Sequence, residues 1–270
     1  MWPGTDLASR AYLSYLRDLP AVRGKLRVGL AIAARLSSLG IRGENGARFE
    51  LEPSDWISWV IAREGGYERD SLRLSSELLR GGGQVLDIGA AWGLYTCTLG
   101  VLPGVEVVSV EPTPRNFARL ERNLALNPGV RARLYAVALA SEAALVGMAR
   151  AEGGNALTAR VTAGPSEFHV PAITPRQLVE HAGLTRIKLM KIDVDGTDMA
   201  VARAFPWDRV RPEHVLFEIW EPYLREAGES IESVLGYFSG LGYRARRPDG
   251  SPYTGGQTPG HDLNIWLEAL

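Results

Sequence analysis

The stretch VLDIGAAWGLYT, residues 85–96, passes from a run of apolar residues into a loop that is framed by Gly89 and Gly93. A buried strand, a glycine loop and a helix in this order place backbone N–H groups and the positive end of the helix dipole at the carboxyl edge of a sheet. We therefore expect this loop to bind a ligand that carries a negative group.

The loop departs from the pattern that binds dinucleotides. That pattern needs glycine at the first, third and sixth positions, so that a pyrophosphate comes close to the backbone. Counted from Gly89, the third and sixth positions hold Ala91 and Leu94, and Trp92 adds bulk beside them. A nicotinamide dinucleotide, and with it an oxidoreductase, is therefore disfavoured.

The neighbouring polar residues fit a ligand without phosphate. Asp87 ends the first strand, where its carboxylate is placed to pair with an ammonium group. Glu111 ends the second strand, where a carboxylate accepts hydrogen bonds from both hydroxyls of a ribose. The hydroxyls of Tyr95 and Thr96 lie near the loop amides, on which a ligand carboxylate would rest. S-adenosylmethionine, a nucleoside that carries an amino acid, satisfies all of these groups.

Strand-like and helix-like segments alternate from about residue 49, which favours an α/β fold with a largely parallel sheet. Helices are predicted over residues 70–80, 94–102 and 115–127, the last with Leu120 toward the sheet and with Arg119 and Asn123 outward. Residues 141–171 break this rhythm and are expected to form an irregular or hairpin insertion beside the sheet edge or over the ligand site. The predicted strands are residues 84–88, 105–111, 132–138, 187–194, 214–219, 243–246 and 263–267.

Composition places the chain among ordinary soluble globular proteins. Of its 270 residues, 46% are hydrophobic and 23% are charged, and the formal net charge is −1. Nucleic-acid binding needs a clustered excess of Lys and Arg, so nucleic acid is not expected as a partner. Cys97 is the only cysteine, which excludes an intramolecular disulfide. The sequence shows no signal-peptide pattern and no membrane span, and we expect a cytoplasmic protein.

Residues 1–48 stand apart from the rest of the chain. They carry eight basic and three acidic side chains, a net charge of +5, and their helical pattern breaks around Pro20 and Gly24. We expect an N-terminal helical arm over residues 1–48 and one domain over residues 49–270. The arm would pack on the core or on a second subunit of a homo-oligomer, and a basic face lying on an anionic membrane is the alternative.

Three stretches, in order along the chain, resemble one known family. VLDIGAAWGLYT is followed by VVSVEPTPRNFARLERNLALNP (residues 107–128) and by LMKIDVDGTDMAVARAF (residues 189–205), and the upstream run DWISWVIAREGGYERD (residues 55–70) matches too. Together they resemble the FkbM-type S-adenosylmethionine-dependent methyltransferases. The resemblance implies a seven-stranded, Rossmann-like class I methyltransferase sheet, with six parallel strands, an antiparallel last strand and helices on both faces. The chain departs from the family at Asp195, where Glu is usual, and at Trp92, where a smaller residue or an amide is common.

The resemblance also implies which residues hold S-adenosylmethionine. The glycine loop lies near the methionine end of the cofactor, Glu111 holds the ribose, and Asn116 and Ala138 lie beside the adenine. The cofactor-binding residues that it implies are Glu68, Asp87, Gly89, Ala90, Trp92, Gly93, Tyr95, Thr96, Glu111, Pro112, Asn116, Ala138 and Asp193.

Three residues are candidates for catalysis. Asp193, at the end of the fourth strand, is the first candidate for a base or for a contact to the sulfonium end; capping of the next helix is the alternative. Glu218 lies in an apolar fifth strand, where a carboxylate is costly unless it is paired or near solvent. His261 lies in a Gly-rich loop and is a ready base near pH 7. A divalent metal ion between Asp193 and Glu218 is possible chemistry but is not favoured.

These observations predict an enzyme that moves a methyl group from S-adenosylmethionine to an acceptor. The resemblance implies a hydroxyl of a small molecule, such as a sugar, a lipid or a product of natural-product biosynthesis. A base is needed only where the acceptor must lose a proton. A non-catalytic, nucleoside-binding accessory protein with the same fold is the alternative.

Overall fold

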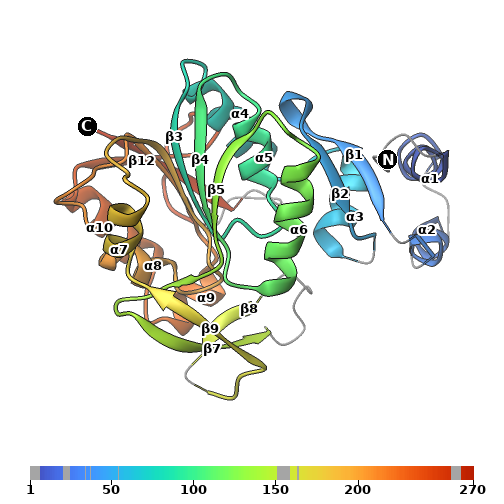
Figure 1. Cartoon of the computed structure of the whole chain (residues 1–270). Coiled ribbons are helices and arrows are strands. Elements are labelled where there is room, and N and C mark those ends of the chain that lie inside the picture. The colour runs from blue at the N-terminus through green and yellow to red at the C-terminus, as the bar shows by residue number, and fades with distance from the viewer. Residues whose placement is uncertain are drawn as a thin grey trace.

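The structure of the protein, a computed structural model, describes residues 7–20, 25–33, 35–36, 38–53, 55–150, 159–162, 164–256 and 263–270. Within these residues the chain forms three sheets of seven, four and two strands, flanked by helices (Figure 1). The α/β class with a large, mostly parallel sheet is confirmed. The molecule has more strands than the sequence predicts, because two smaller sheets accompany the large one.

The seven-stranded sheet has the strand order β12-β13-β11-β10-β3-β4-β5. Neighbouring strands pair in parallel except at β13, which is antiparallel to both β11 and β12. The chain leaves the centre of the sheet in opposite directions from β3 and β10, so a crevice opens at the carboxyl ends of these strands. The strands are β3 (Gly83–Ile88), β4 (Val105–Val110), β5 (Arg131–Tyr135), β10 (Ile187–Ile192), β11 (His214–Glu218), β12 (Tyr243–Arg246) and β13 (Asn264–Ala269).

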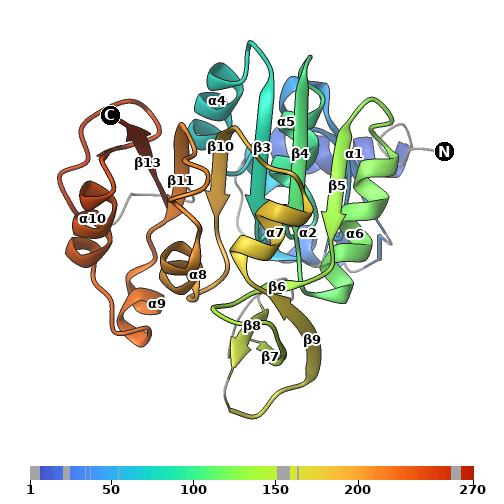
Figure 2. The same cartoon turned by 60° about the vertical axis from the view of Figure 1, so that its left-hand side comes forward.

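Helices cover both faces of this sheet (Figure 2). On one face α4 (Arg69–Leu78) and α5 (Leu94–Gly100) pack on the strands, with α6 (Pro114–Ala125) beside α5. On the other face lie α7 (Pro175–His181), α8 (Asp198–Ala204) and α10 (Ile231–Gly240). The short helix α9 (Glu221–Glu226) follows β11. None of the helices that the structure describes is long and apolar enough to cross a bilayer.

The N-terminal elements pack against the side of the molecule that carries α5 and α6. They are α1 (Leu7–Arg17), α2 (Lys25–Ala33), a hairpin of β1 (Leu39–Arg42) and β2 (Arg48–Leu51) around a 3-10 turn at Glu44–Gly46, and α3 (Trp56–Glu64). Tyr12 and Leu16 of α1 lie in one apolar cluster with Phe49 of β2 and with Trp92. The described part of the arm therefore packs on the core, as one of the two alternatives predicts.

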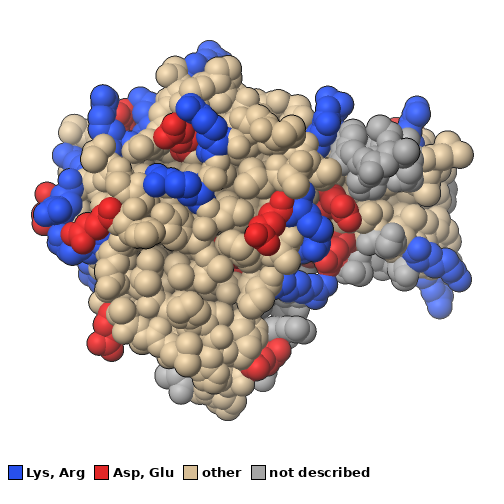
Figure 3. All heavy atoms as spheres, in the orientation of Figure 1, with Lys and Arg blue, Asp and Glu red and all other residues tan. Residues whose placement is uncertain are grey.

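Two expectations about the N-terminal region remain predictions: its division from the rest of the chain and its part in a homo-oligomer. The β1–β2 hairpin spans the boundary expected between residues 48 and 49. The division into an arm and a domain stays a prediction. On the face shown in Figure 3, Lys and Arg side chains lie among Asp and Glu side chains. A homo-oligomer formed through the arm stays a prediction.

The prediction that Arg119 and Asn123 of α6 face outward is wrong, because both side chains are buried. The β1–β2 hairpin and the segment before α3 cover the side of α6 that a sheet-and-helix pattern leaves to solvent. The Asn123 side chain accepts a 2.8 Å hydrogen bond from the Glu50 amide and donates one of 2.8 Å to the Trp92 carbonyl. α6 thus connects the hairpin to the glycine loop.

The chain between β5 and α7 forms a four-stranded sheet in the order β6-β9-β7-β8. Its strands are β6 (Ala138–Leu139), β7 (Ala144–Arg150), β8 (Ala159–Thr162) and β9 (Phe168–Ile173). The strand predicted over residues 132–138 is therefore too long, because β5 ends at Tyr135 and Ala138 pairs in the second sheet. The hairpin expected within residues 141–171 corresponds to β7 and β8, which pair antiparallel.

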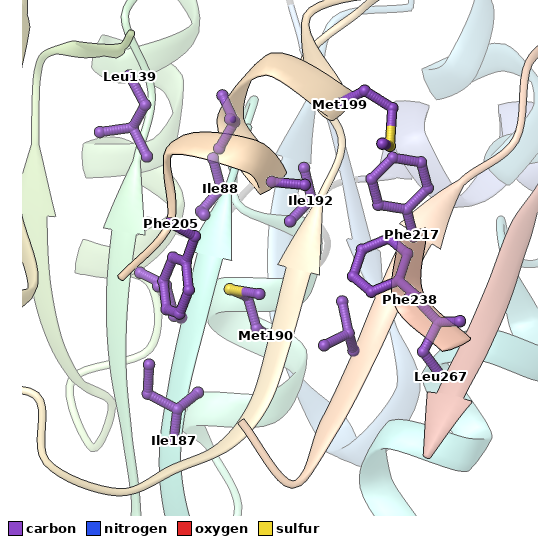
Figure 4. Close-up of a cluster of buried hydrophobic side chains, with 14 of the residues drawn as sticks. Ile88, Leu139, Ile187, Met190, Ile192, Met199, Phe205, Phe217, Phe238 and Leu267 are labelled. Atoms are coloured by element: carbon purple, nitrogen blue, oxygen red, sulfur yellow. The ribbon is translucent and has the colours of Figure 1, made fainter. Parts of the chain in front are cut away.

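The main apolar core lies between the large sheet and the helices α7, α8 and α10 (Figure 4). Met190 and Ile192 of β10 point into it beside Phe217 of β11. Phe238 of α10 closes the layer, with its ring centroid 5.3 Å from that of Phe217. Because burial of each such side chain stabilises the fold by about 1.5–3 kcal/mol, this layer holds the ends of β10 and β11 firmly in place.

Candidate functional site

A cavity of about 350 Å³ opens at the carboxyl ends of β3, β4, β10 and β11. It lies at the crevice that the strand order predicts, and most of the residues singled out in the sequence line it. Gly93 and Thr96 are not part of its wall, and His261 lies outside the described residues. The predicted residues in the wall are Glu68, Asp87, Gly89, Ala90, Trp92, Tyr95, Glu111, Pro112, Asn116, Ala138, Asp193 and Glu218.

The glycine loop owes its shape to two close approaches. Gly89 has φ +86°, and a Cβ at this position would lie 1.7 Å from the backbone oxygen of Asp193. Gly93 has φ +93°, and its Cβ would lie 2.6 Å from the side chain of Leu120. Only glycine combines a positive φ with contacts this close. The loop therefore lies tight against β10 on one side and α6 on the other.

The bulk of Trp92 serves the packing of the N-terminal elements. Its side chain is only 2% exposed and meets Phe49 of β2 edge-on, with ring centroids 5.3 Å apart. Trp92 also forms part of the cavity wall. Trp92 is thus large, although it lies between two glycines, because its side chain anchors the glycine loop to the β1–β2 hairpin.

The two carboxylate oxygens of Asp87 differ in their hydrogen bonds to the described residues. Its Oδ2 accepts a 2.7 Å hydrogen bond from the hydroxyl of Thr96, which lies 2.8 Å from the Ser109 hydroxyl. Its Oδ1 is buried and has no hydrogen-bond partner among the described residues. Burial raises the pKa of Asp87, against the attraction of Lys191. A cationic donor in the cavity would complete this carboxylate, and Thr96 orients it from behind.

Glu111 is held by the two loops that flank it. Its Oε2 accepts a 2.9 Å hydrogen bond from the Ala91 amide, and its Oε1 accepts one of 2.8 Å from the Thr113 amide. Burial raises the pKa of Glu111 to about 7, although these hydrogen bonds act in the opposite direction. Oε1 also accepts a long hydrogen bond of 3.5 Å from Asn116 Nδ2, which a ligand hydroxyl could replace, and Oε2 keeps capacity for a further donor.

Lys191 is a buried cation in the cavity wall that the sequence reasoning missed. Its ammonium pairs with Asp193, lies 3.9 Å from a carboxylate oxygen of Glu68 and lies 4.7 Å from the centre of the Tyr95 ring. Burial lowers the pKa of Lys191, but the carboxylates of Asp193, Glu68 and Asp87 outweigh burial and raise it. The available signal was a lysine inside the apolar strand LMKIDV, since a buried cation needs carboxylate partners.

The segment after β10 carries Asp193, Asp195 and Asp198, and the first two line the cavity. Asp198 accepts hydrogen bonds from the Val194 amide (2.8 Å) and the Gly196 amide (3.0 Å), so it, and not Asp193, fixes the start of α8. Asp195 lies in this segment with φ +52°. Burial, and then repulsion by Asp193, raises the pKa of Asp195 well above its ordinary value.

Glu218 ends β11 on the same cavity. Burial, and then repulsion by Asp193, raises the pKa of Glu218 well above its ordinary value. In the part of the chain that the structure describes, no group of three or more His, Cys, Asp and Glu side chains is arranged to hold a metal ion.

Part of the cavity wall comes from elements that lie far apart in the chain. Trp56 of α3 lines it together with Trp220 and Tyr223 beside and within α9. Arg160 of β8 pairs with Glu226 of α9 and lies over the Tyr223 ring, 5.4 Å from its centre. These two contacts connect β8 to α9 at the cavity wall.

Four aromatic residues lie near the strand ends along the chain, and the structure places them in two different environments. Trp220 and Tyr223 line the cavity, whereas Trp207 and Tyr253 belong to the apolar core. Trp56 was missed because it lies far from these strands in the chain, and only its place directly after the N-cap Asp55 of α3 marked it.

The fold is similar to those of several solved methyltransferases. An rRNA methylase from Streptococcus thermophilus is 14% identical, with a TM-score of 0.44, over 74% of this chain and 94% of that one. A putative O-methyltransferase from Klebsiella pneumoniae is 16% identical, with a TM-score of 0.43, over 74% and 80%. A putative methyltransferase from Streptococcus mutans, in complex with SAH, is 10% identical, with a TM-score of 0.45, over 74% and 98%.

A search of curated proteins found no match. A scan against protein families matched residues 87–245 to the family described as methyltransferase FkbM domain. The matched segment begins at Asp87 and includes Glu111, Lys191, Asp193 and Glu218.

Proposed function

The chain belongs to the FkbM family of methyltransferases, and from this premise we propose that it transfers a methyl group from S-adenosylmethionine to a hydroxyl of a small-molecule acceptor. The resemblance seen in the sequence is confirmed by the match over residues 87–245. The match makes the chain a methyltransferase that uses S-adenosylmethionine. The hydroxyl acceptor and the role of each residue are our proposals.

The residues of the cavity fit the cofactor. Asp87 Oδ1, buried and without a partner among the described residues, suits the ammonium of the methionine end. Glu111, with both oxygens turned toward loop amides, suits the ribose hydroxyls. Gly89 lets the backbone lie where a side chain would intrude, and Asn116 and Ala138 line the part of the cavity proposed for the adenine.

S-adenosylmethionine supplies an electrophilic methyl group on a sulfonium centre. The protein's own task is to hold the acceptor oxygen in line with that methyl group, exclude water and take up the hydroxyl proton. Asp193 is our choice for the group that takes the proton, because its carboxylate lines the cavity and is the nearer of the two that pair with Lys191. Glu218, which ends β11 at the cavity wall, suits a hydrogen bond to the acceptor.

The single observation that carries this proposal is the coincidence of Asp87, Glu111 and Asp193 in one cavity at the carboxyl edge of the sheet. Isothermal titration calorimetry with S-adenosylmethionine and its demethylated product tests it directly. Both ligands should bind saturably, and Glu111→Ala should weaken binding. Glu106→Gln is the matched control, since Glu106 lies at the start of the same strand and pairs on the surface with Arg131.

Catalysis is tested separately from binding. Methyl transfer from labelled cofactor to a panel of hydroxylated small molecules should be lost in Asp193→Asn, by a factor of about 10²–10⁴ if the carboxylate acts as a base. Cofactor binding with no acceptor methylated would favour a non-catalytic nucleoside-binding protein. Wild-type protein that binds neither ligand would overturn the proposal.

A further inference from the structure

Three aromatic residues of the cavity wall, Trp56, Trp220 and Tyr223, do not belong to the apolar core clusters. Trp56 lines the cavity and is 55% exposed, which is unusual for the largest apolar side chain. Trp220 and Tyr223 face the same cavity from the region of α9. Aromatic faces beside a cavity are typical contact surfaces for rings of bound molecules.

Trp56 is held rigidly, although its indole is exposed. It stacks on Trp59, with ring centroids 5.3 Å apart and an interplanar angle of 22°, and Trp59 is 5% exposed. The preceding residue, Asp55, caps α3 by accepting a 3.0 Å hydrogen bond from the Ser58 amide. The buried guanidinium of Arg119 on α6 lies 3.9 Å from the Asp55 carboxylate. The platform is therefore in place before a ligand arrives.

Two carboxyl residues of the cavity wall, Asp195 and Glu218, are half-buried. Neither Asp195 nor Glu218 makes a side-chain hydrogen bond or an ion pair with any residue within the described ranges. A carboxylate in a partly desolvated cavity is stabilised by a ligand that donates hydrogen bonds to it. Hydroxyl and ammonium groups are such donors.

The charge of the described cavity wall excludes one class of acceptor. Six carboxyl residues line the wall, against the two cations Lys191 and Arg160. Both cations are already engaged, Lys191 by Asp193 and Arg160 by Glu226. An acceptor carrying a phosphate or a carboxylate would meet unbalanced negative charge in a partly desolvated site.

We propose that the acceptor is a ring with several hydroxyl groups, uncharged or aminated, which packs one face on Trp56 and donates hydrogen bonds to Asp195 and Glu218. The inference rests on the proposed methyl transfer and narrows its acceptor to a class. Trp56 determines specificity for the ring, and the two carboxyl groups determine specificity for charge. The carboxyl groups thus reject acidic sugars and sugar phosphates.

The test uses four matched probes on the full chain saturated with S-adenosylhomocysteine. The probes are methyl glucoside, methyl glucosaminide, methyl glucuronide and glucose 6-phosphate, with binding measured by calorimetry and by saturation-transfer NMR. We expect the neutral and aminated probes to bind and both anionic probes to bind at least about tenfold more weakly. Trp56→Ala should weaken the two binding probes by about three- to tenfold, and Trp56→Phe should restore most of the loss.

The carboxyl groups are tested by the double variant Asp195→Asn, Glu218→Gln. It should abolish the discrimination against the anionic probes and leave the binding of S-adenosylhomocysteine unchanged. Glu213→Gln is the control for loss of a carboxylate outside the cavity, because Glu213 precedes the same strand at the opposite edge of the sheet and pairs there with Lys188. It should keep the discrimination intact.

The outcomes separate this inference from the proposed function. Equal or tighter binding of the anionic probes, or binding of none of the four by protein that binds S-adenosylhomocysteine, would overturn the acceptor class and leave methyl transfer standing. Protein that does not bind S-adenosylhomocysteine would overturn both. Retained probe affinity in Trp56→Ala would remove the aromatic platform from the proposal.

Discussion

At Glu111 two local forces oppose each other, and the balance makes this carboxyl sensitive to pH near neutrality. Burial raises its pKa from the ordinary 4.5 to about 7, while the amides of Ala91 and Thr113 favour the ionised form. The folded protein without cofactor thus binds this proton more tightly than the unfolded chain does. The stability that Glu111 contributes is complete below pH 4.5 and is lost as the pH rises to about 7.

Cofactor binding should show the opposite dependence on pH. A carboxylate that accepts two ribose hydroxyls must be ionised, so affinity for S-adenosylhomocysteine should rise as the pH increases through about 7. Between pH 8 and pH 6 we expect the dissociation constant to increase by about tenfold. Calorimetry over this range measures the effect, and Glu111→Gln should bind weakly with a flat profile. A wild-type profile as flat as that of the variant would contradict the role given to Glu111.

Two buried threonines of α5 offer a paired test of the support behind Asp87. The Thr96 hydroxyl donates to Asp87, whereas the Thr98 hydroxyl is buried and has no hydrogen-bond partner among the described residues. Thr96→Val should therefore lower the free energy of unfolding by about 1–3 kcal/mol and weaken cofactor binding. Thr98→Val, with the same change in shape, should be neutral or stabilising. Urea denaturation compares the two, and equal losses in both variants would refute the difference.

Among the elements, the glycine loop depends on close contact more than on backbone freedom alone. Gly89 and Gly228 both have positive φ, but only Gly89 would drive a Cβ into the backbone of Asp193. Gly228→Ala should cost about 1–2 kcal/mol for the left-handed conformation. Gly89→Ala adds overpacking of about 1–3 kcal/mol and should also displace the loop and abolish cofactor binding. Thermal unfolding and calorimetry on both variants separate the two costs.

The elements also show where sequence reasoning succeeds. β3, β4, β10 and β11 are apolar runs bounded by glycine or acidic residues, so pattern alone locates them and, with them, Asp87, Glu111 and Asp193. The positions of these three residues at one edge of the sheet follow from the strand ends at which they lie. The crevice at the carboxyl edge follows from the alternation of strands and helices.

Other parts of the site depend on contacts between distant segments. Arg119 looks like an outward-facing residue of an amphipathic helix, and only the covering N-terminal segment makes it buried. Trp56 and Arg160 reach the cavity through α3 and β8, which the strand pattern does not place. The part of the site proposed for the cofactor can thus be predicted from the local sequence pattern. The part proposed for the acceptor cannot.

Across the whole molecule, Asn123 connects three regions that are far apart in the chain. Its side chain bonds the Glu50 amide of the hairpin and the Trp92 carbonyl of the glycine loop, from a position on α6. Asn127, one turn later, makes comparable hydrogen bonds to the backbone of Arg48 but none to the loop. The hairpin is therefore bonded to Asn123 within α6 and to Asn127 just after its end, and only Asn123 also bonds the glycine loop.

This difference predicts two separable phenotypes. Asn123→Ala and Asn127→Ala should each lower the free energy of unfolding by about 1–3 kcal/mol, because each removes two side-chain hydrogen bonds to the backbone. Only Asn123→Ala should also weaken the binding of S-adenosylhomocysteine, since it releases the Trp92 carbonyl. Denaturation and calorimetry under the same conditions test both effects. Equal affinity in the two variants would show that the hairpin does not influence the loop.

The placement of β13 has a consequence for biosynthesis. β12 leaves the ribosome before residues 264–269, yet among the described strands of the large sheet it pairs with β13 alone, and β13 lies between it and β11. A nascent chain that has extruded everything up to β12 still has the β11 edge of its growing sheet exposed. Translation that stopped short of residue 264 would leave that edge open to pairing between chains, so the final strand acts as the seal that ends this vulnerable interval.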